Sequence, residues 1–177
     1  MFCPNFRQDL EKIGAAWINI FTLQAVLQLK LQKPKSKIYG LFVDFKKSFL
    51  SINDNLLWKK MSKIGVSDKV IRVLAMLYTK ATMAIKSQYD TSNPINVTKG
   101  VLQGEILSPT LFALFISDLE EFLISKGIRG VSVSSLTEIL LLAYADDIVI
   151  VADSIAMMRR ILKALKKYCE INCLSEK

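Results

Sequence analysis

The apolar and polar positions in the first half of the chain predict helices on either side of one buried strand. Apolar residues crowd the stretch 8–32, which we expect to be helical, and the basic segment 33–37 contains a proline and predicts a turn. Residues 38–45 form a nearly unbroken apolar run, which is typical of a buried strand. Two helices are predicted next, one capped by Asn53 and one restarting at Ser67.

The second half of the chain mixes short apolar runs with further helices. Four runs predict strands: 82–88, 95–98, 138–144 and 148–152. Ser108, followed by proline, begins a helix that we expect to reach Ser125, and Ser154 opens the last helix. Elements in this order predict an α+β fold, in which helices pack on one face of an antiparallel sheet.

The composition excludes several classes of protein. Of the 177 residues, 51% are hydrophobic and 23% are charged, with only 7 Gly and 4 Pro, so a disordered, collagen-like or linker chain is excluded. Polar residues interrupt the longest apolar stretch, 15–29, and the N-terminus lacks the order of a signal peptide. We expect no membrane span and an intracellular protein, in the nucleus or the cytoplasm.

The residue types that are missing narrow the chemistry further. The chain has no His, which excludes a Ser–His–Asp triad, a Cys–His pair and a Cys2His2 zinc site. The chain has only three cysteines, Cys3, Cys169 and Cys173, and a small, odd number of cysteines argues against a disulfide framework. Any reaction must therefore use carboxylates, lysines, hydroxyls and the backbone.

The charge is unevenly distributed. The formal net charge is +8, and the segments 1–40, 41–90 and 151–177 are basic, whereas 91–150 carries more acids than bases. A basic frame around an acidic segment suits a polyanion held near a site that also binds cations, although each basic run can equally be an ordinary solvated face. The mean hydropathy of +0.32 is high for a small domain and indicates either tight packing or apolar faces that meet other parts of a larger protein.

The first candidate for chemistry is Asp44, near the end of the predicted strand 38–45. A carboxylate at the end of a buried apolar strand is costly unless it is paired or binds a cation. The alternative is a side chain that turns into solvent or pairs with Lys46 or Lys47, and Asp44 alone does not decide between the two.

The second candidate is the sequence Tyr144-Ala145-Asp146-Asp147 between two apolar runs. A tight hairpin usually requires glycine for its positive φ, but this turn has two adjacent acids and no glycine. A strained, doubly acidic turn indicates a metal, and Mg²⁺ prefers hard oxygen ligands. Two Mg²⁺ ions held by Asp44 and Asp146 on adjacent strands would activate a 3′-hydroxyl and stabilise a leaving pyrophosphate. The alternative is an acidic surface turn.

The third candidate is the segment 99–109. It has two glycines, Gly100 and Gly104, followed by a helix start at Ser108-Pro109. Glycine lets the backbone approach a ligand closely, and a helix N-terminus favours phosphate. Loops of this kind are common, so an ordinary connection between elements is the alternative.

Taken together, the three segments resemble the palm of reverse transcriptases, over about residues 36–175. The motifs are FVDFKKSF at 42–49, GVLQG at 100–104 with LSPTLF at 107–112, and YADD at 144–147. The most similar subgroup is that of the non-LTR (LINE-type) retrotransposons, and group II intron proteins are the neighbouring one.

The resemblance implies roles for individual residues. Asp44, Asp146 and Asp147 would hold two Mg²⁺ or Mn²⁺ ions, with the backbone carbonyl of Phe45 as a further ligand, and Phe49 would be the aromatic gate that excludes a nucleotide 2′-hydroxyl. The residues implied along the nucleotide are Gln103, Gly104 and Tyr144, and those implied along the nucleic acid are Lys46, Lys47, Lys99, Ser108 and Pro109. The implied partners are an RNA template, a DNA primer, dNTP and the missing fingers and thumb segments of a parent polyprotein, with no membrane.

The chain also departs from the family's pattern. Leu50 stands where the family usually has Asp, and Leu102 stands where it has Arg or Lys. We expect partial fingers over 1–35 and a palm over 36–177 that is truncated at its C-terminal end, with no thumb. Two functions stay open: an RNA-directed DNA polymerase, and a non-catalytic remnant that at most binds nucleic acid.

Overall fold

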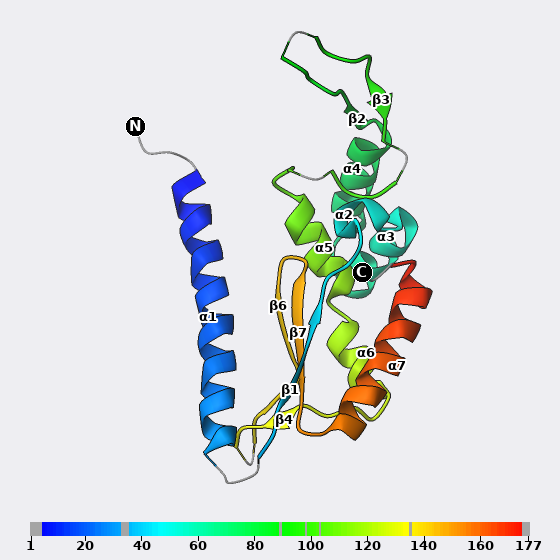
Figure 1. The fold of residues 1–177 in the computed structure, drawn as a ribbon. Coiled ribbons are helices and arrows are strands. Elements are labelled where there is room, and N and C mark those ends of the chain that lie inside the picture. Colours follow the sequence, from blue (N-terminus) through cyan, green and yellow to red (C-terminus); the bar gives the residue numbers. More distant parts are fainter. Residues whose placement is uncertain are drawn as a thin grey trace. The chain divides into compact units, whose positions relative to one another are not determined.

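A computed structural model of the chain describes residues 5–32, 36–88, 90–97, 99–102, 104–134 and 136–174, with side chains from residue 17 onward. The elements follow one another along the chain as drawn in Figure 1. They are α1 (Asn5–Leu31), β1 (Tyr39–Val43), α2 (Ser48–Ser51), α3 (Asp54–Lys63), α4 (Asp68–Thr79), β2 (Thr82–Met83), β3 (Ile95–Asn96), α5 (Ser108–Ile116), α6 (Leu119–Ser125), β4 (Val131–Ser132), β5 (Glu138–Ile139), β6 (Leu141–Tyr144), β7 (Asp147–Ala152) and α7 (Ile155–Asn172).

These elements form two compact units. The sheet unit comprises Met1–Asp44 and Asp118–Tyr168, and the helical unit comprises Phe45–Ser117 and Cys169–Lys177. The chain thus passes from one unit to the other directly after Asp44. The expected division into fingers and palm after residue 35 stays a prediction.

Three antiparallel strands in the order β1-β7-β6 form the centre of the sheet unit. Val43 lies opposite Ile148 in the first pairing, and Tyr144 lies opposite Asp147 in the second. β7 takes the central place because it is an almost continuous run of Ile and Val, which suits a strand covered on both faces. The predicted strand at 148–152 is confirmed, and the one predicted at 138–144 forms the two short strands β5 and β6.

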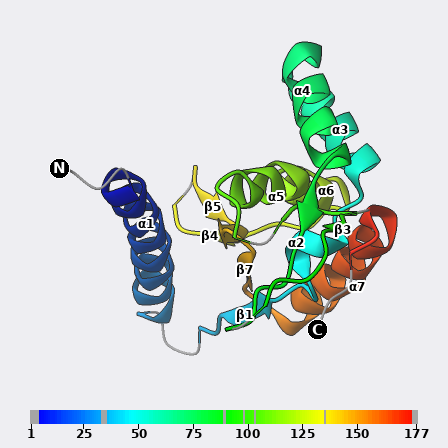
Figure 2. The same cartoon turned by 90° about the horizontal axis from the view of Figure 1, so that it is seen from above.

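Helices cover both faces of this sheet. On one face, Val149 and Val151 of β7 pack with Val26 of α1. Successive side chains of a strand point to opposite faces, so the buried Ile148 and Ile150 point the other way, toward α6 and α7 (Figures 1 and 2). The predicted α+β fold is confirmed: α6 and α7 cover one face, and α1 adds cover to the other because β7 is apolar on both.

The two helices α6 and α7 are tied together at both ends of α6. The Tyr168 hydroxyl donates to Asp118 Oδ1 at 2.6 Å, and the rings of Tyr168 and Phe122 lie edge to face with centroids 5.3 Å apart. At the other end, Arg160 Nη2 donates to the carbonyl oxygen of Lys126 at 3.1 Å. Residue 168 meets the start of α6 and residue 160 meets its end, so the helices run antiparallel.

One predicted helix is divided in two. The sequence predicts a single helix over 108–125, whereas the structure has α5 and α6 with a break at Ser117 and Asp118. Asp118 precedes α6 with φ −88° and ψ 1°, outside helical geometry, and its carboxylate accepts the Tyr168 hydroxyl. The prediction of a single helix was therefore wrong, because the break depends on a tyrosine far along the chain.

The helical unit is assembled around α3 and α5. Asn53 caps α3 as predicted, and its side chain accepts from Leu56 N at 3.1 Å. Lys60 of α3 donates to the carbonyl oxygen of Phe115 at 2.7 Å, and its ammonium lies 4.7 Å from the centroid of the same ring. Among the described residues, the structure contains no helix that is both long and apolar enough to cross a membrane.

Within the helical unit, the segment after Asp44 is in close contact with the loop before α5. Gly100 has φ +82°, and a Cβ atom at this position would lie 2.6 Å from the carbonyl oxygen of Phe49 and 2.7 Å from Leu50 Cα. Val101 N donates to the same Phe49 oxygen at 2.9 Å. The backbones are so close that only glycine fits at position 100.

Gly100→Ala should therefore lower the free energy of unfolding by more than Gly104→Ala. Both positions have positive φ, which costs about 1–2 kcal/mol for an L residue, but a Cβ at Gly104 would meet nothing within 4 Å. Urea unfolding of both variants measures the difference, which isolates the cost of the close approach. Equal losses of stability in the two variants would contradict this packing.

Candidate functional site

The ends of β1 and of the β6–β7 hairpin bring the three candidate aspartates to one end of the sheet. β1 ends at Val43 opposite Ile148, and continuing this register by one residue places Asp44 across from Asp147. Tyr144 pairs with Asp147 to close the hairpin, which leaves Ala145 and Asp146 as its turn. The prediction of a strand that ends at Asp44 beside the hairpin is confirmed at the level of the backbone.

The hairpin turn carries its strain at a residue that the sequence did not single out. Ala145 has φ +53°, in the left-handed region, whereas Asp146 and Asp147 do not have positive φ. A non-glycine residue in this conformation costs about 1–2 kcal/mol and is held there by the surrounding structure. Here the paired strands β6 and β7 hold the turn, and with it the position of Asp146.

The three carboxylates differ in exposure and do not form a ready-made metal cluster. Asp44 and Asp147 are exposed and Asp146 is half-buried. Among the residues that the structure describes, no group of three or more Asp, Glu, Cys or His side chains is gathered closely enough to hold a metal ion. The donors are nevertheless hard oxygens on neighbouring strands, and Mg²⁺ commonly takes one or two carboxylates together with substrate phosphates.

The aromatic residues that follow Asp44 pack against α5 in the helical unit. Phe45 is 1% exposed, and its ring lies edge to face with that of Phe112 at 6.0 Å between centroids. The half-buried Phe49 lies 5.5 Å from the same ring. Phe112 therefore fixes both side chains, together with the Val101 hydrogen bond to the Phe49 carbonyl.

A carboxylate that the sequence analysis overlooked organises the loop at 99–109. Asp54 Oδ1 accepts from Gly100 N at 3.0 Å. Burial raises the pKa of Asp54, while the Gly100 N–H and the charge of Lys99 act in the opposite direction. Asp54 is the first residue of α3, where an acid is favourable for the helix itself. Its position in the sequence therefore gives no sign of the contact with Gly100.

The remaining predicted residues of this loop have different surroundings. Gly104 is exposed, and Pro109 lies in the first turn of α5. Ser108 is 1% exposed, and its hydroxyl donates to the Leu102 carbonyl oxygen, so in this structure its side chain holds the loop. Gln103 lies outside the described residues.

A second overlooked pair stands beside this loop. The Tyr78 hydroxyl donates to Glu105 Oε2 at 2.5 Å. Burial, followed by the bond to Glu105, raises the pKa of Tyr78 to about 12. Nothing in the sequence connects the two residues, because they come from α4 and from a loop that the fold brings to it.

The predicted cations are exposed. Lys46, Lys47 and Lys99 all have solvent-facing side chains, and Lys47 takes the left-handed conformation, with φ +53°, at the start of α2.

The structure divides the predicted site residues between its two units. Asp44, Tyr144, Asp146 and Asp147 lie in the sheet unit, and the described others lie in the helical unit.

Comparison with known sequences identifies the family. Residues 4–175 match the family "Reverse transcriptase (RNA-dependent DNA polymerase)". A retrovirus-related Pol polyprotein from the type-1 retrotransposable element R2 of Popillia japonica is 29% identical over 126 residues, which is 71% of this chain and 21% of that protein. The chain therefore spans about a fifth of this relative's length.

Solved structures show the same fold. Apo telomerase from Candida tropicalis, truncated from its C-terminal domain, superposes with a TM-score of 0.61 at 17% identity, over 92% of this chain and 33% of that one. Telomerase from Candida albicans, in complex with a TWJ fragment of telomeric RNA, gives 0.64 at 14% identity, over 92% and 30%. The motifs and the family match agree, and the chain therefore belongs to the reverse transcriptase (RNA-dependent DNA polymerase) family, as a domain of the non-LTR retrotransposon type.

Proposed function

We propose that the chain is the palm of an RNA-directed DNA polymerase, which joins a dNTP to the 3′-hydroxyl of a primer with the help of two divalent metal ions. The observation that supports the proposal is the strand register, in which β1 ends with Val43 opposite Ile148 and Asp44 follows next to the hairpin of Asp146 and Asp147. This is the placement that two-metal chemistry requires of carboxylates from distant parts of a chain.

The three aspartates would hold the metals in unequal ways. Asp44 and Asp147 are exposed, so both can reach ions that arrive with a nucleotide, while the half-buried Asp146 is held by the strained turn. Bound Mg²⁺ or Mn²⁺ would lower the pKa of the attacking hydroxyl and stabilise charge on the leaving pyrophosphate. The phosphates of the substrate would complete a ligand set that the protein alone does not close.

Further residues of the chain would bind the substrates. Phe49 would exclude a nucleotide with a 2′-hydroxyl, and its ring is fixed for this by Phe112. Tyr144, Gly104 and Gln103 would line the nucleotide, and the exposed Lys46, Lys47 and Lys99 would contact phosphates of an RNA template and a DNA primer. These assignments rest on the family resemblance, and such a reaction would take place inside the cell.

A non-catalytic remnant is the second candidate, and two observations favour it. Leu50 and Leu102 are half-buried apolar residues at places where the family presents charge. In addition, the described carboxylates do not close into a group of three. Such a remnant would retain nucleic-acid binding through its basic surface and lose metal-dependent synthesis.

Asp146→Asn should lower dNTP incorporation on a primed RNA by on the order of 100-fold or more, because metal stabilisation of the transition state is worth several kcal/mol and each 1.36 kcal/mol is tenfold. The measurement is Mg²⁺-dependent primer extension, by the chain alone and by the chain joined to the segment that follows the matched region in the R2 relative. We expect the chain alone to be poorly active and the joined form to be more active, since holding the duplex in place contributes to rate.

The matched control is Asp153→Asn, at the exposed residue that directly follows the opposite end of β7, which should leave incorporation unchanged. Broadening of NMR signals by Mn²⁺ gives a second readout, and it should affect residues near Asp44, Asp146 and Asp147 in the native chain only. Equal incorporation by the native and Asp146→Asn forms of the joined protein, with no Mn²⁺ effect, would establish the remnant instead.

Leu102→Arg by itself should change incorporation by less than about threefold. Positioning of the substrates contributes roughly 7–11 kcal/mol in well-oriented reactions, and one restored cation does not supply it. Leu102→Gln, which adds a polar group without charge, is the control. A gain of tenfold or more that is specific to Arg would show that this single departure from the family pattern limits activity.

A further inference from the structure

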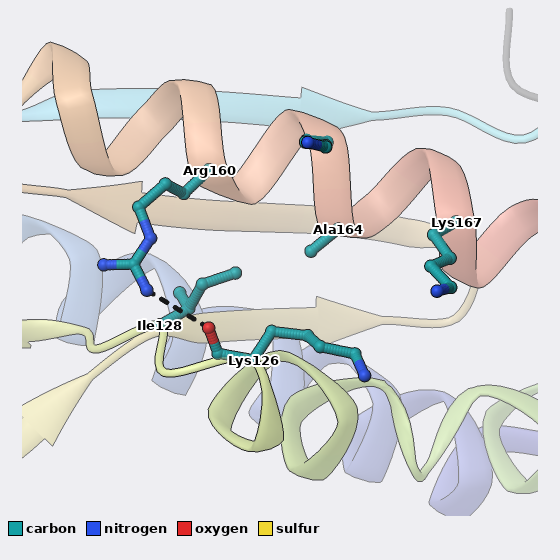
Figure 3. A pocket seen from close by; sticks show the side chains of 6 residues that line it. Lys126, Ile128, Arg160, Ala164 and Lys167 are labelled. Atoms are coloured by element: carbon teal, nitrogen blue, oxygen red, sulfur yellow. Dashed lines mark hydrogen bonds between the residues drawn. The ribbon is translucent and has the colours of Figure 1, made fainter.

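A basic pocket lies between the end of α6 and one side of α7, within the sheet unit (Figure 3). Its volume is about 350 Å³. Among the residues that the structure describes, four cationic and two small or apolar side chains line it, and no acidic one does: Lys126, Arg160, Lys163 and Lys167, with Ile128 and Ala164. None of these residues is used by the proposed polymerase chemistry.

The guanidinium of Arg160 is held in place at one end of this basic pocket. Its Nη2 donates to the carbonyl oxygens of Lys126 at 3.1 Å and Gly127 at 3.0 Å, at the C-terminal end of α6. Gly127 has φ +69°, and a Cβ there would lie 3.1 Å from the same nitrogen, so glycine lets the guanidinium come close. Arg carries five N–H donors, and among the described residues only those of Nη2 have partners, so those of Nε and Nη1 can reach a ligand.

The other cations continue from Arg160 along α7. Lys163 and Lys167 follow at spacings of three and four residues, which places them on the same side of the helix. At a rise of 1.5 Å per residue the row is about 10 Å long, which is enough to follow a few consecutive phosphates of one strand. Only one acid, Glu170, lies on α7, beyond the end of the row.

The lining also indicates what kind of polyanion fits. No aromatic side chain of the described residues lines the basic pocket, so bases would have nothing there to stack on. The side chains of Ile128 and Ala164 offer no hydrogen-bonding group for reading a sequence. The cations of α7 repeat every three to four residues, and no neighbouring group reads a particular base. This pattern suits the regularly repeated phosphates of a polynucleotide better than the irregularly spaced carboxylates of an acidic peptide.

The basic pocket is separate from the candidate aspartates. The aspartates lie at the hairpin end of the sheet, whereas α7 begins after the other end of β7 and, with α6, covers a face of the sheet (Figure 1). A strand bound there would follow a different path from one bound at the hairpin. We propose that the basic pocket of α6 and α7 is an accessory site for the phosphate backbone of a single polynucleotide strand. This role does not require the chain to be a polymerase.

The test compares two pairs of substitutions with the same change in charge. Lys163→Gln with Lys167→Gln removes two cations from the basic pocket, and Arg159→Gln with Lys166→Gln removes two exposed cations of α7 that do not line it. Anisotropy of a labelled, mixed-sequence single strand, as RNA and as DNA, is measured over a series of salt concentrations with the whole 177-residue chain. Thermal unfolding checks that both variants fold.

The pocket pair should lower affinity at least tenfold at low salt and reduce the slope of log affinity against log salt by about 1.4, since each phosphate contact on a single strand contributes about 0.7. The control pair should change affinity much less. Comparable affinity for RNA and DNA indicates recognition of phosphate alone, and a clear preference for RNA adds a contact with the 2′-hydroxyl; both outcomes support the site.

Acetylation of lysines, read by mass spectrometry, locates the bound strand. RNA should shield Lys163 and Lys167 and leave Lys166 reactive. Equal losses of affinity in the two pairs would show that only net charge matters and would overturn the proposal. Shielding by polyglutamate as effective as that by RNA would also overturn it and identify a surface for acidic peptides. Asp146→Asn should bind as the native chain does, so the test is independent of catalysis.

Discussion

The antiparallel pairing of β1 with β7 is the interaction on which the candidate site depends. It joins a strand from the first quarter of the chain to one near its end, and only through it does Asp44 come to lie beside Asp146 and Asp147. The pairing is stabilised on both faces, by Val26 of α1 on one side and by the helix layer on the other. A slip of one residue in the register would turn every side chain of β1 to the opposite face, so the buried pattern of β7 also specifies where the carboxylates are.

Much of this arrangement could be predicted from local signals in the sequence. The apolar runs on either side of the YADD motif predict the hairpin, the run before Asp44 predicts a strand end, and Asn53 predicts a helix start that its side chain then caps. Each of these signals acts within a few residues, where apolar periodicity and capping chemistry are decisive. The family resemblance added what local signals could not, namely the roles of individual residues such as Phe49 and Gln103.

The features that escaped prediction all depend on contacts between distant residues. The break between α5 and α6 involves Tyr168. The loop before α5 depends on Asp54 and on the contact of Gly100 with Phe49. No local sequence pattern predicts these contacts. The strain in the hairpin is found at Ala145, where the twist of the paired strands, and not the acidity of the turn, determines the backbone. The sequence also predicted basic runs without showing which lysines share a pocket, because that depends on how α6 and α7 pack.

The contact of Asn19 with β6 has a consequence for how the protein behaves at high concentration. β6 is an outer strand of the three-stranded sheet, and an outer strand presents backbone groups on which a strand of another molecule can pair. Asn19 Nδ2 donates to the carbonyl oxygen of Ala143 at 2.9 Å, so α1 occupies one of these groups with its own side chain. The helix thereby protects the sheet against edge-to-edge association, and removing α1 from a shortened chain would expose both this acceptor and the apolar face beneath, which together favour aggregation.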